Sequence, residues 1–264
     1  MSAFSAASPV SDVVATLRAA GCVFAEDEAR LLLDAACSPV ELADMVRRRV
    51  EGAPLEVILG WAEFCGRRVV VDAGVFVPRT RSTFVVQQAV ELARPGAVVV
   101  DLCCGAGALG AAIAAAVDGI DLHAADIEPA AVRCARRNLA EFGGQVHEGD
   151  LYDPLPAALR GRVDVLVVNA PYVPSEEITM MPPEARDHEP RVALDGGPDG
   201  VDVHRRVAAE ASRWLTPGGS LLIETGEHQA DLTAGTMAEH GLVPRVVTSE
   251  EFYCTVVIGT KPAA

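Results

Sequence analysis

Short apolar runs alternate with segments of helical composition along most of the chain. Runs such as Val163–Val168 are continuous and rich in β-branched residues, which is typical of strands buried on both faces of a parallel sheet. Strands alternating with helices predict a doubly wound α/β fold. We therefore expect a Rossmann-like sheet with seven strands, near residues Ala97–Val100, Ile120–Ala125, Gln145–His147, Val163–Val168, Ser220–Glu224, Val243–Val247 and Phe252–Ile258.

The first fifty residues show a different pattern. Apolar residues recur at three- and four-residue spacing in Ser11–Ala20, Ala25–Ala36 and Val40–Val50, which predicts a small helical domain over residues 1–52. Gly52-Ala53-Pro54 breaks the pattern, and residues 57–77 are rich in β-forming residues. We expect a β-hairpin linker over residues 53–78, with strands Trp61–Phe64 and Arg68–Val71, before a main domain over residues 79–264.

Charge and cysteine content narrow the class of protein. The chain has 264 residues and a formal net charge of −15, which opposes nonspecific binding to nucleic acid. Its seven cysteines are scattered without a C-x-x-C pair, so we expect reduced thiols, no metal site and a cytoplasmic location. The first ten residues lack the features of a secretory signal, and no segment is long and apolar enough to span a membrane.

A glycine-rich turn follows the strand at Ala97–Val100. Gly105, Gly107 and Gly110 match the G-x-G-x-x-G dinucleotide pattern, which alone is weak evidence. Asp101 lies four residues earlier, on the strand, where its carboxylate would pair with a cationic amino group better than with a pyrophosphate. This placement favours S-adenosylmethionine over NAD as the ligand, and a tight turn with a capping aspartate is the structural alternative.

Two further acidic residues follow the next strands of the predicted sheet. Asp126 lies 21 residues after Gly105, the distance at which an acidic residue takes ribose hydroxyls. Asp150 follows the third strand, where it would accept a hydrogen bond from the adenine amino group while Leu151 packs on the ring. Because an open sheet binds its ligand outside the carboxyl ends of its strands, these residues predict one shared site.

The sequence Asn169-Ala170-Pro171-Tyr172 follows the fourth strand and indicates the reaction. The Asn169 side-chain oxygen and the Ala170 carbonyl oxygen can each accept one hydrogen bond from a planar NH2 group, which positions its nitrogen for methyl transfer. Pro171 stiffens the turn, and Tyr172 offers an aromatic wall. A plain strand-ending turn is the alternative interpretation.

These motifs resemble class I S-adenosylmethionine-dependent methyltransferases and, more narrowly, the HemK/PrmC family of protein-(glutamine-N5) methyltransferases. The resemblance covers nearly the whole chain, and His188–Gly200 discriminates it from generic methyltransferases. It rests on the segments PLEVILGWAEF, Phe76-Val77-Pro78-Arg79, DLCCGAGALG, ADIEPAAVRCARRN, GDLYDPLP, VVNAPYVP, HEPRVALDGGPDG and LTPGGSLLIETGEHQ.

The resemblance implies a role for each matching residue. The N-terminal helical domain would help to hold the protein substrate, and Asn169 to Tyr172 would hold the glutamine amide. The cofactor S-adenosylmethionine would be bound by Asp101, Cys103, Gly105, Ala106, Gly107, Asp126, Ile127, Asp150, Leu151 and Asn169.

Three positions depart from the family pattern. The usual N-P-P-Y reads N-A-P-Y, which is tolerable because the second position acts through its carbonyl. The usual P-R-P-E-T-E is Pro78 to Thr83 without either glutamate, and the terminal D-L-x-G-x-x-R is replaced by residues 249–253. The last two departures indicate a divergent paralogue.

The leading hypothesis is therefore a methyltransferase that acts on the amide nitrogen of a glutamine in a protein, with a release factor or a ribosomal protein as the candidate partner. Direct binding of nucleic acid or of a membrane is not expected. One alternative is an N6-adenine or N4-cytosine methyltransferase, since an exocyclic amine suits the same four residues. Another alternative is an S-adenosylmethionine-binding regulatory protein without catalysis.

Overall fold

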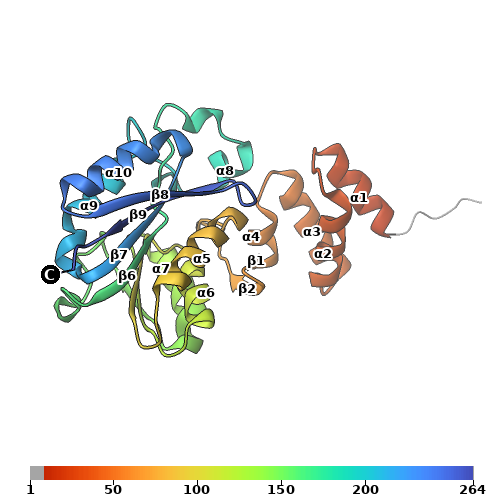
Figure 1. Ribbon diagram of the computed structural model, residues 1–264. Helices are drawn as coiled ribbons and strands as arrows, with labels where there is room; N and C mark the ends of the chain where they lie inside the picture. Colours follow the sequence, from red (N-terminus) through yellow and green to blue (C-terminus); the bar gives the residue numbers. More distant parts are fainter. Residues whose placement is uncertain (1–8, 264) are drawn as a thin grey trace, which may run out of the picture.

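The computed structural model describes residues 9–263, and its main body is a sheet with helices on both faces (Figure 1). The seven strands lie in the order β5-β4-β3-β6-β7-β9-β8, and β9 runs antiparallel to both of its neighbours. This arrangement confirms the predicted seven-stranded, Rossmann-like α/β sheet. The strands are β3 (Val98–Leu102), β4 (Asp121–Asp126), β5 (Gln145–Glu148), β6 (Val163–Val168), β7 (Leu215–Thr225), β8 (Val243–Ser249) and β9 (Cys254–Thr260).

Helices cover the two faces of this sheet (Figure 1). Alternate side chains of one strand point to opposite faces, so Val99 packs in the core beneath one group of helices and Val100 in the core beneath the other. Both faces are apolar, which explains why the strands read as continuous hydrophobic runs. The first group is α5 (Thr83–Leu92), α6 (Ala108–Ala116) and α7 (Pro129–Leu139), and the second is α9 (Asp202–Trp214) and α10 (Ala230–Glu239).

The N-terminal helices form a separate small core away from the sheet (Figure 1). Leu17, Leu32, Met45 and Ile58 are its largest buried side chains. The helices are α1 (Pro9–Ala19), α2 (Ala25–Ala35), α3 (Pro39–Val50) and α4 (Leu55–Leu59), and the hairpin of β1 (Trp61–Phe64) and β2 (Arg67–Val70) follows them. The three predicted helices and the hairpin are found, while the domain boundaries at residues 52 and 78 stay a prediction.

An ion pair joins this helical part to the main body. Arg49 on α3 donates to both carboxylate oxygens of Glu28 on α2, at 2.6 and 3.1 Å, and reaches Glu184 at 3.3 Å. Glu184 belongs to α8 (Pro183–His188), which lies in the segment before α9. The N-terminal helices therefore contact the same segment that lines the functional cavity described below.

One expectation about local structure is corrected. Residues 57–59 belong to the helix α4 and not to a β-rich stretch, because this helix completes the N-terminal core through Ile58. The segment over residues 173–200 contains α8 and short 3-10 turns at Ile178–Met180 and Arg191–Ala193. The predicted place of Asp101 on the strand is confirmed, since Asp101 lies within β3.

Two further observations concern the described residues alone. Among residues 9–263, no helix is long and apolar enough to cross a membrane, and no cluster of three or more ligating side chains could hold a metal ion. The sequence-based prediction about a secretory signal depends on residues 1–8, which lie outside the described residues.

Candidate active site

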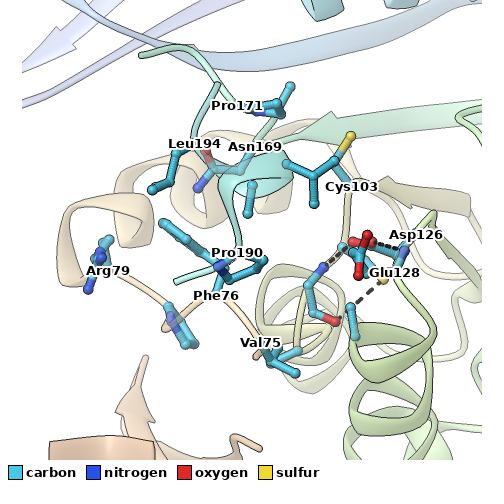
Figure 2. Close-up of a pocket in the computed structure, with 18 of the residues that line it drawn as sticks. Val75, Phe76, Arg79, Cys103, Asp126, Glu128, Asn169, Pro171, Pro190 and Leu194 are labelled. Carbon is cyan, nitrogen blue, oxygen red and sulfur yellow. Dashed lines mark hydrogen bonds between the residues drawn. The ribbon is translucent and has the colours of Figure 1, made fainter. Parts of the chain in front are cut away.

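A cavity of about 540 Å³ opens at the carboxyl ends of β3, β4 and β6. The strand order reverses between β3 and β6, so the cavity lies where open α/β sheets bind their ligands. Figure 2 shows Asp126 and Glu128 at one end of it and Asn169, Pro171 and Leu194 at another. The predicted site residues that line it are Cys103, Gly105, Ala106, Asp126, Ile127, Asp150, Leu151, Asn169, Ala170, Pro171 and Tyr172.

Asp126 holds the glycine turn at the first end. One carboxylate oxygen accepts the backbone N–H of Gly105 at 2.8 Å, and the other accepts that of Glu128 at 2.9 Å. Burial raises the pKa of this carboxyl, and the two N–H groups act against that shift. Each oxygen keeps a lone pair for a hydroxyl group in the cavity.

The turn itself requires left-handed backbone conformations. Gly105 has φ +53° and Cys103 has φ +54°, a conformation that is uncommon for a residue with a Cβ. Burial raises the pKa of the Cys103 thiol, so this side chain stays neutral and serves as an apolar wall. Ala106 and Ile127 add to the same wall.

Asp101 and Gly107 are predicted ligand contacts that do not line the cavity. The fully buried Asp101 carboxylate accepts the Gly110 N–H at 2.9 Å through one oxygen, and its other oxygen has no hydrogen-bond partner among residues 9–263. Gly107 begins α6 with φ +76°, and a Cβ there would lie 3.2 Å from Ala135 and Leu139 on α7. Direct contact of these two residues with the cofactor therefore stays a prediction, and in this structure both brace the turn from behind.

Asp150 and Leu151 lie at a third side of the cavity. The Asp150 carboxylate accepts a hydrogen bond from Arg206 on α9 at 2.6 Å, and Arg206 also lines the cavity. Leu151 adopts φ +48°, which directs the chain around the cavity wall. The expected adenine contact of Asp150 would therefore share this carboxylate with Arg206.

Asn169 and Tyr172 belong to a hydrogen-bond network at the opposite end. The Asn169 Nδ2 donates to Ser82 Oγ at 3.2 Å, and Ser82 Oγ donates to Glu224 Oε2 at 2.5 Å. Arg81 donates to Glu224 at 3.0 Å and to the Tyr172 hydroxyl at 2.5 Å. Burial raises the pKa of Tyr172, and the nearby Glu224 carboxylate raises it further. The phenol is therefore neutral.

Glycines of the segment before α9 support this end of the cavity. A Cβ at Gly196 would lie 2.7 Å from the Tyr172 Cα, and one at Gly200 would lie 2.4 Å from the Tyr172 carbonyl oxygen. Such distances exclude any larger residue, because real Cβ atoms do not approach backbone atoms so closely. Backbone hydrogen bonds from Val173 to Leu194 and from Gly196 to Val173 join this glycine-containing segment to the segment that follows Tyr172. The D-G-G-P-D-G sequence thus fixes the turn that begins at Asn169.

Several lining residues were not identified from the sequence. Four of them are Phe76, Arg79, Pro190 and Leu194, and Figure 2 shows Arg79 at the left, Phe76 and Pro190 near the centre and Leu194 above them. Arg79 pairs at 2.7 Å with Glu189, whose side chain is 2% exposed. The burial of Glu189 is not visible in the sequence, so no local signal indicated this contact.

Comparisons with known proteins first define the class. Residues 67–182 match the family model described as the methyltransferase small domain. Two solved structures share the fold: a ribosomal protein L11 methylase from Lactobacillus delbrueckii subsp. bulgaricus (TM-score 0.53, 14% identity, covering 74% of this chain and 85% of that one) and a methyltransferase from Pyrococcus furiosus (TM-score 0.54, 16% identity, 74% and 89%). These matches show the methyltransferase fold and place a methyltransferase small domain at residues 67–182.

Curated relatives then define the family. A release factor glutamine methyltransferase from Geobacter sulfurreducens is 37% identical over 79% of this chain and 74% of its own length. The enzyme of the same name from Mycolicibacterium smegmatis is 36% identical over 84% and 85%. The chain therefore belongs to the release factor glutamine methyltransferase family, as the sequence motifs indicated.

Proposed function

We propose that this protein transfers a methyl group from S-adenosylmethionine to the side-chain amide nitrogen of a glutamine in a protein, with a peptide chain release factor as the substrate class. The carrying observation is the pair of free acceptors at the end of β6. Neither Asn169 Oδ1 nor the Ala170 carbonyl oxygen accepts a hydrogen bond from any residue that the structure describes, and both residues line the cavity. A primary amide nitrogen carries two N–H donors that match them.

The cavity fits an adenosyl methyl donor. Its volume lies within the range usual for pockets that enclose such ligands. Asp126 offers acceptors for ribose hydroxyls, Asp150 and Leu151 offer one acceptor and one apolar surface for adenine, and Phe76 adds aromatic surface. When bound, S-adenosylmethionine supplies an electrophilic methyl group on a sulfonium.

The residues of the clamp (Asn169 to Tyr172) act on the acceptor nitrogen. Two hydrogen bonds, to Asn169 Oδ1 and to the Ala170 carbonyl, hold the nitrogen at a fixed place and favour positive charge developing on it. Pro171 fixes the turn, and the buried, neutral Tyr172 places a ring beside the planar group. After methyl transfer, the amide nitrogen releases one of its two protons to solvent.

The test is in vitro methylation of a purified release factor by the full chain, followed by mass spectrometry of its peptides. We expect the added mass of one methyl group on a glutamine side chain. Methylation of another residue type, or of no protein in a complete lysate, would contradict the proposal. Parallel reactions with DNA and RNA test the alternative acceptor amines, which the relatives do not favour.

A second acceptor class is favoured by one relative. A methyltransferase from Streptomyces pristinaespiralis, named for 4-amino-L-phenylalanine and 4-methylamino-L-phenylalanine, is 38% identical over 70% of this chain and 65% of its own length. An aromatic amine carries the same planar NH2 group as an amide, so the same two acceptors fit it. The same assay with 4-amino-L-phenylalanine distinguishes the two acceptors, since only one of them yields methylglutamine.

A further inference from the structure

The amide of Asn169 can be oriented in two ways, and only one of them presents its oxygen to the substrate. The two orientations differ by exchange of Oδ1 and Nδ2, which have nearly the same shape, so the hydrogen-bond network decides between them. In this structure Nδ2 faces Ser82, and Oδ1 has no partner among residues 9–263. The orientation of the Asn169 amide depends on which neighbour accepts the single hydrogen bond that the Ser82 hydroxyl can donate.

Glu224 accepts the hydrogen bond from the Ser82 hydroxyl. Its side chain is 1% exposed and is paired with Arg81, and an ionised carboxylate can only accept hydrogen bonds. One oxygen accepts from Arg81 and from the Tyr172 hydroxyl, and the other accepts from Ser82 at 2.5 Å. The Ser82 hydroxyl hydrogen is therefore committed to Glu224, and the Ser82 oxygen can serve Asn169 only as an acceptor.

The fold brings these groups together from three separate segments. Asn169 directly follows β6, and Glu224 lies on the neighbouring strand β7, where Val168 pairs with Ile223. Ser82 and Arg81 belong to the 3-10 turn Thr80–Ser82 that precedes α5. Ser82 is 2% exposed, so water does not compete for its hydroxyl.

We propose that Glu224 and Ser82 are positioning residues that fix the Asn169 amide with Oδ1 toward the substrate nitrogen. We call the hydrogen-bonded chain of Asn169, Ser82 and Glu224 the relay. Its role rests on the proposed function, in which Asn169 Oδ1 accepts a hydrogen bond from the substrate nitrogen. An exchanged amide would place two acceptors, Oδ1 and the Ser82 oxygen, against each other and would aim N–H donors at the substrate N–H groups. Arg81 supplies the counter-charge that keeps the Glu224 carboxylate an acceptor.

The kinetic test compares four variants of the full chain with the wild type. Ser82→Ala removes the acceptor, and Glu224→Gln keeps the side-chain volume but adds an NH2 group that can donate to Ser82 and release its hydroxyl proton toward Asn169. We expect both to lower kcat about tenfold or more through misorientation of a group at the reacting nitrogen, with an unchanged Kd for S-adenosylmethionine. Ser82→Thr keeps the hydroxyl and should restore kcat.

Ser220→Ala is the matched control. Ser220 is 3% exposed and its hydroxyl bonds to Thr260 on β9, away from the cavity lining, so this variant loses the same atom from an equally buried place. We expect its kcat to match the wild type. The relay is overturned if Ser82→Ala keeps the wild-type kcat, or if Ser220→Ala loses as much kcat as Ser82→Ala.

A second measurement is independent of the substrate. Neutron diffraction from perdeuterated wild-type crystals locates the amide deuterons of Asn169 and the hydroxyl deuteron of Ser82. Two deuterons on the Asn169 atom that faces Ser82, with the Ser82 deuteron toward Glu224, support the relay even if the wild type fails to methylate glutamine. Deuterons on the atom that faces the cavity overturn it even if glutamine is methylated.

Discussion

The two ends of the cavity are built in different ways. The glycine turn at Gly105 is held by the Asp126 carboxylate, 21 positions later in the chain, which accepts the backbone N–H groups of Gly105 and Glu128. The clamp at Asn169 is held by side chains from Ser82 and Glu224, which are 87 and 55 positions away in the chain (169 − 82 and 224 − 169). One end therefore depends on local backbone geometry, and the other depends on the packed fold.

The same difference explains what the sequence predicts. The strands, the glycine turn and Asn169 to Tyr172 follow from local patterns, because each occupies consecutive residues whose period or composition is visible. Cavity-lining residues such as Gly105 and Asp126 could be chosen on that basis. The β-α-β-α alternation also predicts a doubly wound sheet, whereas the order of its strands comes from the structure.

The missed contacts depend on tertiary pairing. Ser82 and Glu224 carry no local signal, since a serine before a helix and a glutamate at a strand end read as ordinary capping and surface residues. The position of Asp101 in the sequence does not show on which side of β3 its carboxylate lies. Only packing shows that it faces the Gly110 N–H at the start of α6.

The largest effect is expected at the clamp. Asn169→Ala removes one of two acceptors for the substrate nitrogen, so we predict a loss of about 10²–10³ in kcat, the magnitude typical of deleting one preorganised hydrogen-bonding group. The Kd for S-adenosylmethionine, measured by titration calorimetry, should stay at the wild-type value. Loss of cofactor binding together with turnover would assign Asn169 to the other end of the cavity.

A change at the glycine turn should have the opposite signature. Asp126→Ala leaves the N–H groups of Gly105 and Glu128 without their acceptor and removes the acceptor for ribose hydroxyls. Hydrogen bonds to a charged group contribute about 1.5–3 kcal/mol each, so we predict a Kd for S-adenosylmethionine weaker by about tenfold to a hundredfold. The kcat at saturating cofactor should remain close to wild type, and a selective loss of kcat would contradict the comparison.

Asp101 should affect stability and its dependence on pH. Burial raises the pKa of this carboxyl from 3.8 to about 7, so the folded state binds a proton that the unfolded state has already released. The native state therefore loses stability as pH rises from about 4 toward 7, by ~2 kcal/mol between pH 5 and pH 8. Asp101→Asn, which cannot ionise, should lack this part of the pH dependence.

Urea unfolding of the wild type and of Asp101→Asn at pH 5 and pH 8 measures that difference. The variant should gain stability relative to the wild type as pH rises. An equal pH dependence in both proteins would mean that the Asp101 carboxyl titrates in its ordinary range.

The smallest effect is expected at Arg206. Its ion pair with Asp150 is substantially exposed, with side-chain exposures of 56% and 39%, and such pairs contribute about 0–1 kcal/mol. Arg206→Ala should change the Kd for S-adenosylmethionine only a few-fold, and added salt should reduce the difference further. A change comparable with that of Asp126→Ala would place Arg206 among the principal ligand contacts.

The most direct test of the account is a crystal structure of the chain with S-adenosylhomocysteine and a glutamine-containing peptide bound together. We predict the glutamine amide nitrogen within hydrogen-bond distance of both Asn169 Oδ1 and the Ala170 carbonyl oxygen, with the sulfur of the nucleoside on its other side. A peptide whose amide lies outside the reach of these two oxygens, with the nucleoside in place, would contradict the account.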